Sequence, residues 1–367
     1  MRVLVVNAGS SSVKLSLLGP HYETLVDRDL PAPRALLDAG QLQTALADGL
    51  GEADVVGHRI VHGGSQFRDP VLIDASVEAA LRGLVDLAPL HQPKSLAALD
   101  AVSRALPGVP AVACFDTAFH ATIPDAAAIY ALPAAWAGRW KIRRYGFHGL
   151  SHAWIAHRAP ELLGVPTSEV RTVSCHLGAG ASLCAIDGGR SIDTTMGFTP
   201  LEGLVMATRS GNVDPGLLLW LLEHEAVSTG ELAHALEHES GLLGLAGTAD
   251  MREVLQRAGN DDPGASLARD VYLHRLRAGI AGMTAALGGL EVLAFTGGVG
   301  ERAAEIRAAA AEGLSYLGVA IDSERNAGAG EDAEISAAGA TVRTVVVRAR
   351  EDIQIAREAR RVMAARP

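Results

Sequence analysis

The chain has 367 residues, of which 49% are apolar and 20% are charged, a composition that indicates a globular protein long enough for two hydrophobic cores. Its formal net charge of −10 argues against a general binder of nucleic acid or of membrane surfaces, so an anion site would need a local basic patch. The longest obvious apolar cluster, residues 217–222, is too short to cross a bilayer.

The first predicted element is a β-hairpin over residues 3–18. Four apolar residues at 3–6 predict a buried strand, a polar Gly/Ser turn follows, and alternating apolar residues at 13–17 predict a second strand. The turn would present backbone N–H groups and hydroxyls, and Lys14 would add a cation, which together suit a phosphate. On its own, the segment fits an ordinary hairpin with a polar tip equally well.

This hairpin does not have the pattern of a Walker-type phosphate loop. That motif has Gly directly before its Lys and a helix directly after it, whereas Val13 precedes Lys14 and a strand pattern follows. A phosphate-binding hairpin therefore favours an actin-like nucleotide-binding architecture over a Walker NTPase.

Residues 171–187 repeat the strand–turn–strand pattern. Small residues occupy equivalent places in the two turns: Gly178, Gly180 and Ser182 correspond to Gly9, Ser10 and Ser12. A third glycine cluster, at 295–301, follows a predicted strand and opens an Ala-rich helix over 302–314. A strand that leads into a Gly turn and a helix N-terminus suits a nucleotide phosphate or ribose.

The remaining pattern mixes helices with strands. Helices are predicted over 76–88, 93–105, 151–163, 214–239, 250–258, 264–288 and 351–365, and strands near 53–61, 110–115, 171–176, 182–186, 291–295 and 341–348. Two copies of one hairpin predict a duplicated α/β fold with a cleft between two domains. We expect an N-terminal domain over 1–150, joined by the C-terminal helix 352–367, and a nucleotide-binding domain over 151–351. Closure of such a cleft would exclude water from a phosphoryl transfer.

Several charged residues stand at the ends of predicted strands or in irregular segments. Arg59 ends one strand and Arg209 lies in a polar segment, and two arginines can hold a transferring phosphoryl group together with Mg²⁺. Asp116 ends an apolar strand, so it must be hydrogen-bonded, paired or bound to metal. Glu351 and Asp352 begin the last helix, where they would ligate Mg²⁺ or simply favour the helix N-terminus.

His148 and His152 are four residues apart at a predicted helix start. A zinc pair is conceivable, but the general-base Glu of the zincin motif is missing and no third ligand is evident, so a contact between His148 and a phosphoryl oxygen fits better. Cys114, Cys175 and Cys184 lack disulfide or metal spacing and are interpreted as small buried residues. With no leader pattern before the first strand, we expect a cytoplasmic protein.

Ten short fragments occur in the order in which they occur in one known family: NAGSSSVK, HRIVHGG, LAPLHQP, CFDTAFH, YGFHGLSH, HLGAGAS, GFTPLEGLVMATRSG, DMR, TGGVGE and REDIQIA. The chain thus resembles, almost end to end, the acetate and propionate kinases of the acetokinase family. The resemblance implies a duplicated actin-like (ribonuclease H-like) fold and a homodimer. It also implies reversible, direct in-line transfer of the γ-phosphoryl group of ATP to acetate, giving acetyl phosphate and ADP with Mg²⁺ or Mn²⁺.

The resemblance also assigns roles by matching position. Arg59 and Arg209 would bind the carboxylate and the phosphoryl group, His148 would stabilise the transition state, and Asp116, Asn7 and Glu351 would position the metal. The first phosphate loop would comprise Asn7, Ser10, Ser12 and Lys14, and the second His176, Gly178 and Gly180. The adenosine would be held by Asp250, Arg252, Gly297, Gly298, Gly300 and Glu301, and the methyl group by Val61, Leu90, Phe147 and Pro200.

The chain departs from the usual family pattern at several positions. Ala179, Ala207, Asn212 and Arg302 stand where the family usually has Asn, Gly, Asp and Asn, and Ala-Arg-Glu-Asp replaces the usual Thr-Asn-Glu-Glu around Glu351. These departures leave the preferred nucleotide and the size of the carboxylate open.

Three alternatives to an acetate kinase stay open at this point. One is a propionate or other short-chain carboxylate kinase, and another is a non-catalytic actin-like protein that only binds ATP. A sugar kinase would need an Asp base and a polar acceptor pocket. A carboxylate acceptor needs no general base, because it is already ionised near neutral pH.

Overall fold

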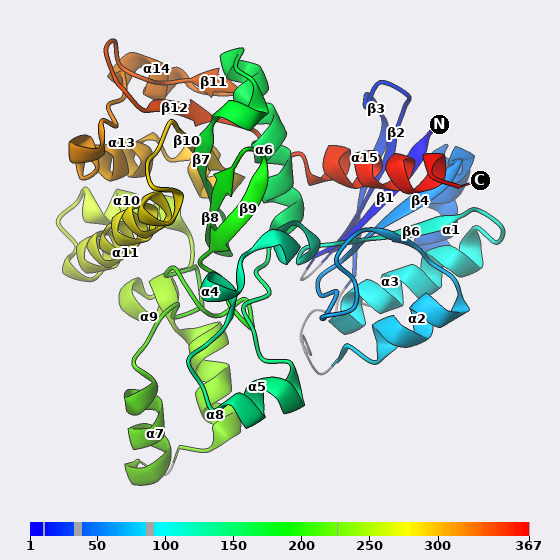
Figure 1. Cartoon of the computed structure of the whole chain (residues 1–367), viewed down its shortest axis with the longest axis horizontal. Coiled ribbons are helices and arrows are strands. Elements are labelled where there is room, and N and C mark those ends of the chain that lie inside the picture. The colour runs from blue at the N-terminus through cyan, green and yellow to red at the C-terminus, as the bar shows by residue number, and fades with distance from the viewer. Residues whose placement is uncertain (10–11, 33–38, 86–91, 226, 367) are drawn as a thin grey trace. The chain divides into compact units, whose positions relative to one another are not determined.

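A computed structural model describes residues 1–9, 12–32, 39–85, 92–225 and 227–366. Two of the expected site residues, Ser10 and Leu90, lie outside these ranges. The chain forms two compact units (Figure 1). Unit 1 comprises Met1–Ala121, Phe147–Trp154 and Arg350–Pro367, and unit 2 comprises Thr122–Gly146 and Ile155–Ala349. Among the described residues, no helix is both long and apolar enough to span a membrane.

Unit 1 is built on one six-stranded mixed sheet with the order β3-β2-β1-β4-β6-β5. The strands are β1 (Val3–Ala8), β2 (Ser12–Leu18), β3 (Thr24–Pro31), β4 (Val55–Ile60), β5 (Val71–Leu72) and β6 (Ala111–Phe115). β1, β2 and β3 pair antiparallel, and β4 and β6 continue the sheet parallel to β1. The predicted first hairpin is therefore confirmed, with Asn7 directly opposite Lys14.

Helices cover both faces of this sheet (Figure 1). On one face, Val56 of β4 shares a core cluster with residues of α3 (Gln92–Ala105), beside α1 (Ala39–Ala47) and α2 (Ala75–Arg82). On the other face, α15 (Glu351–Ala364) packs on β1, β4 and β6. A Cβ on Gly57 would lie 2.6 Å from Ile355 Cγ2, so glycine at this position lets α15 lie close to the sheet. Burial of both faces explains why most of β1 and all of β6 read as apolar runs.

Unit 2 repeats the strand plan of unit 1 in a second six-stranded sheet, with the order β11-β12-β10-β7-β8-β9. Its strands are β7 (Arg171–Leu177), β8 (Ala181–Asp187), β9 (Arg190–Thr194), β10 (Val292–Thr296), β11 (Ala333–Glu334) and β12 (Arg343–Val346). Again three antiparallel strands begin the sheet, and β10 and β12 continue it parallel to β7. The two hairpins and their parallel partners confirm the predicted duplication.

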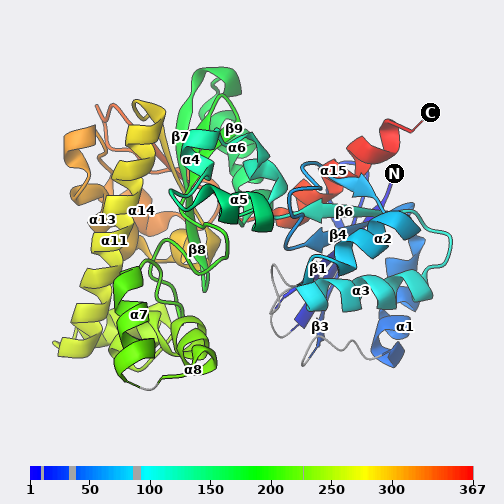
Figure 2. The ribbon, with the colours of Figure 1, turned by 60° about the horizontal axis from the view of Figure 1, so that its bottom comes forward.

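The long helix α11 (Pro263–Leu287) packs on β8 and is the yellow helix of Figure 2. The other helices of unit 2 are α4 (Asp125–Ala128), α5 (Ala134–Trp140), α7 (Pro215–His224), α8 (Thr229–His234), α9 (Gly241–Ala246), α10 (Met251–Ala258), α12 (Gly297–Arg302), α13 (Ala304–Glu312) and α14 (Ser323–Gly328). Helix α6 (Gly149–Leu163) contributes residues to both units.

Two predicted helices differ from those observed. The helix predicted over 214–239 is divided, because Ser228 and Glu231 form a capping box that starts a new helix, α8. The helix predicted over 302–314 is observed as α13, which begins at Ala304, and a separate helix, α12, occupies the glycine segment before it. The two helices are separated at Ala303, whose φ of −93° and ψ of 81° are not helical. The start at Gly297 uses a φ of 78°, which only glycine adopts without strain.

Candidate active site

Four polar side chains of unit 1 form a continuous hydrogen-bonded chain at the ends of the central strands. Arg59, near the end of β4, donates to Asp116 beside it, with Nη2–Oδ2 at 2.6 Å and Nε–Oδ1 at 3.1 Å. The Oδ1 of Asn7, on β1, accepts from Arg59 Nη1 at 3.1 Å. Asn7 Nδ2 in turn donates to Glu351 Oε2 at 3.1 Å. Residues separated by up to 344 positions are therefore brought together, as expected where parallel strands end at one edge.

Burial makes the charges of this cluster interdependent. Asp116 is only 1% exposed, and burial raises the pKa of its carboxyl group while Arg59 opposes that rise and Glu351 adds to it. Burial alone would lower the pKa of the Arg59 guanidinium, but Asp116 and Glu351 together raise it. The cluster thus needs its cation, because without Arg59 the buried carboxylate of Asp116 would have only a second carboxylate, that of Glu351, as a charged neighbour.

The backbone at the start of α6 is hydrogen-bonded to the backbone of Asp116. Gly149 N donates to Asp116 O at 2.8 Å, and a Cβ on Gly149 would lie 2.2 Å from that oxygen. His148, just before the helix, has a φ of 55°, a conformation that side-chain-bearing residues adopt rarely. Such backbone outliers cluster at functional sites, and the role expected for His148 stays a prediction.

The alternative of a zinc pair at His148 and His152 finds no support. His152 is fully buried, and its ring contacts that of His120 edge-on at 5.7 Å between centroids. No group of three or more His, Cys, Asp or Glu side chains suited to a metal ion occurs in the part of the chain that the structure describes.

Three residues of unit 1 are expected to contact a methyl group, and Leu90 is the one outside the described residues. The other two, Val61 and Phe147, are both buried, and Phe147 packs edge-on against the ring of His62 at 5.5 Å between centroids. Lys14 is exposed on β2, and Ser12 begins that strand. Gly9 N donates to Ser12 O at 2.8 Å.

In unit 2, Arg209 lies in the irregular segment between β9 and α7. Its Nη1 donates to Pro200 O at 3.2 Å and lies 3.8 Å from Met206 Sδ. Burial lowers the pKa of the Arg209 guanidinium, and Glu237 raises it. Arg209 is therefore a partly desolvated cation next to Pro200, the one residue of unit 2 expected at the methyl group.

A network that the sequence did not indicate holds this segment in place. Arg144 Nη2 donates to Glu202 Oε1 at 2.7 Å, and the Tyr130 hydroxyl donates to the other oxygen of the same carboxylate. Phe198 N donates to Tyr130 Oη at 2.9 Å. Burial and the bond to Glu202 raise the pKa of Tyr130 beyond its ordinary value, so its hydroxyl stays protonated and keeps donating.

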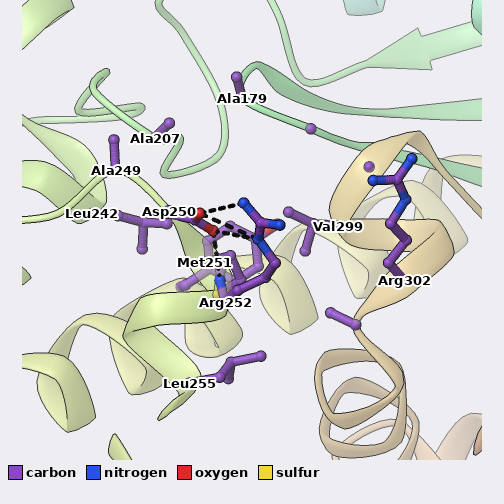
Figure 3. A pocket seen from close by; sticks show the side chains of 14 residues that line it. Ala179, Ala207, Leu242, Ala249, Asp250, Met251, Arg252, Leu255, Val299 and Arg302 are labelled. Carbon is purple, nitrogen blue, oxygen red and sulfur yellow. Dashed lines mark hydrogen bonds and ion pairs between the residues drawn. The ribbon is translucent and has the colours of Figure 1, made fainter. Parts of the chain in front are cut away.

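A pocket of about 570 Å³ lies entirely within unit 2 (Figure 3). Its volume is typical of a small-molecule site. Four residues predicted to bind the nucleotide line it: Gly178, Asp250, Arg252 and Gly298. Three positions at which the chain departs from the family pattern also line it: Ala179, Ala207 and Arg302. Leu242, Leu255 and Tyr272 supply apolar side chains to this pocket, and in the sequence each indicates only a core residue of a helix.

Asp250 and Arg252 form a charge-neutral wall of this pocket. Asp250 caps α10 by accepting from Arg252 N at 2.9 Å, and it also binds the Arg252 guanidinium, with Nη2–Oδ2 at 2.6 Å. The hydrogen bonds from Arg252 lower the pKa of the Asp250 carboxyl group. The side chain of Arg252 remains 85% exposed, so this pair lies where a ligand can reach it.

The glycine turn behind the pocket is built by close backbone packing. A Cβ on Gly297 would lie 2.8 Å from Leu177 O on the neighbouring strand, so only glycine fits. Glu301 Oε1 accepts from Gly297 N at 3.2 Å and from Ala349 N at 2.9 Å. Glu301 therefore braces the turn.

Arg307, which sequence reasoning missed, holds the other side of this turn. It is 1% exposed, and its Nη1 donates to Gly300 O at 2.9 Å and to Glu301 O at 2.8 Å. Its Nε and Nη2 donate to Asn326, each at 2.7 Å. The available signal was a lone Arg within an Ala-rich helix, which by itself suggests only a surface charge.

The second hairpin turn closes like the first. Gly178 N donates to Gly180 O at 2.9 Å, and a Cβ on Gly178 would approach His176 Nε2 to 3.7 Å. His176 lies on β7, directly opposite Ser182 and Thr296 of the neighbouring strands. The predicted second phosphate loop is thus a tight turn at the edge of the pocket.

Comparisons with known proteins extend over both units. The model of the acetokinase family matches residues 34–357. An acetate kinase of Deinococcus deserti is 46% identical, with 100% of this chain and 98% of that protein covered. A crystal structure of Porphyromonas gingivalis acetate kinase has a TM-score of 0.90 at 35% identity, with 99% of each chain covered. A propionate kinase from Francisella tularensis has a TM-score of 0.91 at 34% identity, with 98% of this chain and 99% of that chain covered. These matches confirm the duplicated actin-like fold, and the chain belongs to the acetokinase family.

Proposed function

We propose that this protein is an acetate kinase, which reversibly transfers the γ-phosphoryl group of ATP to acetate and produces acetyl phosphate and ADP. The observation that carries the proposal is the hydrogen-bonded chain Asn7–Arg59–Asp116 with Glu351 at its end, in which Asp116 is buried and the other three residues are partly exposed. Membership of the acetokinase family and the 46% identity to an acetate kinase support it.

The geometry of Arg59 suits a small anion. A guanidinium has five N–H groups, and three of them bind Asp116 and Asn7 through Nε, Nη2 and Nη1. Two N–H groups, one on each Nη, remain for a carboxylate or a phosphoryl oxygen. Because Asp116 fixes the plane of the guanidinium, these two N–H groups keep their direction. Donors that are already oriented stabilise the charge that develops in the transition state without having to reorganise.

No general base is required for this chemistry. An acetate oxygen is already an anionic nucleophile near neutral pH, so the task of the site is to reduce the repulsion between two anions. We assign this task to Arg59 and Arg209, with His148 donating to the phosphoryl group as charge develops. Arg209 enters the reaction partly desolvated, which strengthens its attraction for an anion.

Mg²⁺ is the metal that the acidic residues of unit 1 would hold, with Mn²⁺ as its nearest substitute. Asp116, Glu351 and the amide of Asn7 offer oxygen atoms as metal ligands within one hydrogen-bonded cluster. Mg²⁺ is typically bound by one or two carboxylates, water and substrate phosphates. When bound, the ion would neutralise phosphate charge during the transfer. Glu351 stands at the start of α15, so the packing of that helix on the sheet sets its position.

By resemblance to the family, we propose that Val61, Phe147, Pro200 and Leu90 contact the alkyl group of the acceptor. An apolar wall next to an arginine accepts a carboxylate with a short alkyl group and disfavours a sugar. Propionate is the second candidate acceptor, because a propionate kinase is among the similar structures and one methylene changes binding by only about 1–3 kcal/mol.

The proposal is tested by trapping the acyl phosphate with hydroxylamine. With ATP, Mg²⁺ and acetate, the wild-type protein should form hydroxamate, and propionate and butyrate should give progressively lower kcat/KM. The absence of hydroxamate with all three acids, from folded protein that still binds ATP, would reject the proposal and favour a non-catalytic ATP-binding protein. A parallel sample of Arg59→Ala shows how much hydroxamate forms without the assigned site.

We also propose that the protein forms a homodimer through α7. This helix is apolar on all sides, and Leu217, Leu219 and Trp220 are 47%, 58% and 46% exposed. Exposed apolar surface of this kind marks a protein interface, and a second copy of the chain is the partner that the family resemblance implies. Sedimentation should give a dimer for the wild type and a monomer for Leu219→Glu; a monomeric wild type would reject this proposal.

The net charge of −10 supports small-molecule partners, acetate and ATP, rather than nucleic acid. Cys114, Cys175 and Cys184 are buried and form no disulfide, which supports a cytoplasmic location, where thiols stay reduced.

A further inference from the structure

Three charged side chains line the pocket of unit 2: Asp250, Arg252 and Arg302. Asp250 and Arg252 neutralise each other through their bidentate pair. Arg302 is exposed and has no hydrogen bond or ion pair with any residue that the structure describes. Among the described residues, it is therefore the only charged side chain of the pocket that lacks a counter-charge.

The local backbone directs Arg302 to this pocket. It is the last residue of α12, which begins at the glycine turn, and the helix is interrupted directly after it at Ala303. Figure 3 shows its side chain extended from the end of α12 toward the side of the pocket where Ala179 lies. The guanidinium of Arg252, in contrast, is turned to Asp250 on the other wall.

The turn on that side supplies little to an anion. Ala179 contributes only a methyl group, and the N–H of Gly178 already donates to Gly180 O at 2.9 Å. A phosphate near the turn would therefore lack a side-chain donor from the turn itself. A guanidinium is well suited to phosphate, because its forked N–H groups bind two oxygens and its charge is permanent.

The charge of the whole protein sharpens this requirement. The formal net charge is −10, so a nucleotide with several negative charges is repelled by the protein as a whole and needs a local cation. The Asp250–Arg252 pair is neutral and cannot supply one without breaking its own hydrogen bonds. Arg302 can supply one at no such cost.

We propose that Arg302 binds the phosphate chain of the nucleotide and thereby sets the affinity of this enzyme for nucleoside di- and triphosphates. The proposal rests on the proposed function insofar as a nucleotide occupies this pocket. Arg302 then discriminates between ligands by the number of their phosphates, and the apolar wall with Leu242 and Leu255 accepts the nucleoside.

The test is calorimetric binding of adenosine, AMP, ADP and ATP without acetate, so that turnover plays no part. The variants are Arg302→Asn, Arg302→Lys and, as a matched control, Arg190→Asn, which removes another exposed arginine from unit 2, on β9. Arg302→Asn should weaken ADP and ATP about tenfold, as expected for the loss of a charge-assisted hydrogen bond, and should change adenosine less than about twofold. Arg302→Lys should lie between, and Arg190→Asn should match the wild type.

Salt dependence provides the second readout. The affinity of the wild type for ATP should fall more steeply with added salt than that of Arg302→Asn, because the variant lacks the charge that salt screens. Unchanged ADP and ATP binding in Arg302→Asn would overturn the proposal, and so would an equal loss for adenosine, which would place the contact on the nucleoside. If the wild type forms hydroxamate while Arg302→Asn binds ATP normally, this proposal fails and the proposed function stands. If the binding of the nucleotide series changes as expected but the wild type forms no hydroxamate, the proposal for Arg302 stands and the proposed function fails.

Discussion

Removal of Arg59 should cost both activity and stability, and the stability cost should depend on pH. Arg59→Ala deletes the guanidinium that binds both oxygens of Asp116, a carboxylate that is 1% exposed. Removing one partner of a buried ion pair typically lowers the free energy of unfolding by about 3–5 kcal/mol. The loss of a preorganised cation from the reacting phosphoryl group should lower turnover by roughly 10²–10³ or more.

The pH dependence follows from what remains around Asp116. Burial and Glu351 both raise the pKa of Asp116, and Arg59 is the group that lowers it, so the folded-state pKa must rise further in Arg59→Ala. A carboxyl group whose folded pKa exceeds the ordinary value of 3.8 loses stabilisation as the pH rises toward that folded pKa. The stability difference between wild type and variant should therefore be smallest at low pH. This difference should widen as the pH rises from the pKa of Asp116 in the folded wild type to its higher pKa in the folded variant, by at most about 1.4 kcal/mol per pH unit.

Urea unfolding from about pH 4 to about pH 8 measures this difference. The matched control is the double variant Arg59→Ala/Asp116→Asn, in which position 116 cannot ionise and the pH-dependent part should vanish. A destabilisation of Arg59→Ala that is equal at every pH, or equal to that of the double variant, would show that Asp116 does not carry the buried charge assigned to it.

Two further substitutions test the supports of the two sites, and a third tests Glu358, a partly buried residue of α15. Gly149→Ala places a Cβ 2.2 Å from Asp116 O, so the backbone must shift, and both the melting temperature and kcat should fall. The expected loss of stability is about 1–3 kcal/mol. A normal kcat would show that the position of this backbone does not matter for catalysis. Arg307→Ala removes a buried guanidinium that donates four hydrogen bonds to Asn326 and to backbone carbonyls. It leaves buried acceptors unpaired, so it should cost about 1–3 kcal/mol in urea unfolding and raise the KM for ATP. Burial raises the pKa of Glu358 from 4.5 to about 7, so the wild type should lose on the order of 2–3 kcal/mol of stability as the pH rises between these values. Glu358→Gln should abolish that slope, and an unchanged slope would contradict the assignment.

Much of the fold could be predicted from the sequence, because short local patterns of apolar residues and glycines mark its duplicated hairpins. Each hairpin has an apolar run, a Gly-rich turn and a second apolar run, and both turns formed where these patterns meet. Strand β3 was not predicted, because most of its side chains are exposed and its sequence lacks the alternation of a half-buried strand. The division of the helix predicted over 214–239 depends on a single cap at Ser228, a weak signal within an apolar stretch.

The site was predicted residue by residue but not as a network. The ends of β4 and β6 pointed to Arg59 and Asp116 separately, yet their bidentate pairing depends on two strands becoming parallel neighbours across 57 residues. Arg307 escaped notice because its importance depends wholly on burial, which an Ala-rich helix does not reveal. The roles in catalysis of the residues assigned by resemblance stay predictions until variants are measured.

The central claim is that a carboxylate receives the phosphoryl group of ATP directly. Phosphorus NMR of one sample with protein, ATP, Mg²⁺ and acetate tests it, because ATP, ADP, acetyl phosphate and inorganic phosphate are all observed at once. We predict acetyl phosphate and ADP in equal amounts, formed only when acetate is present, and ATP regained when acetyl phosphate and ADP are supplied instead. Stable ATP, or release of inorganic phosphate alone, would contradict the account.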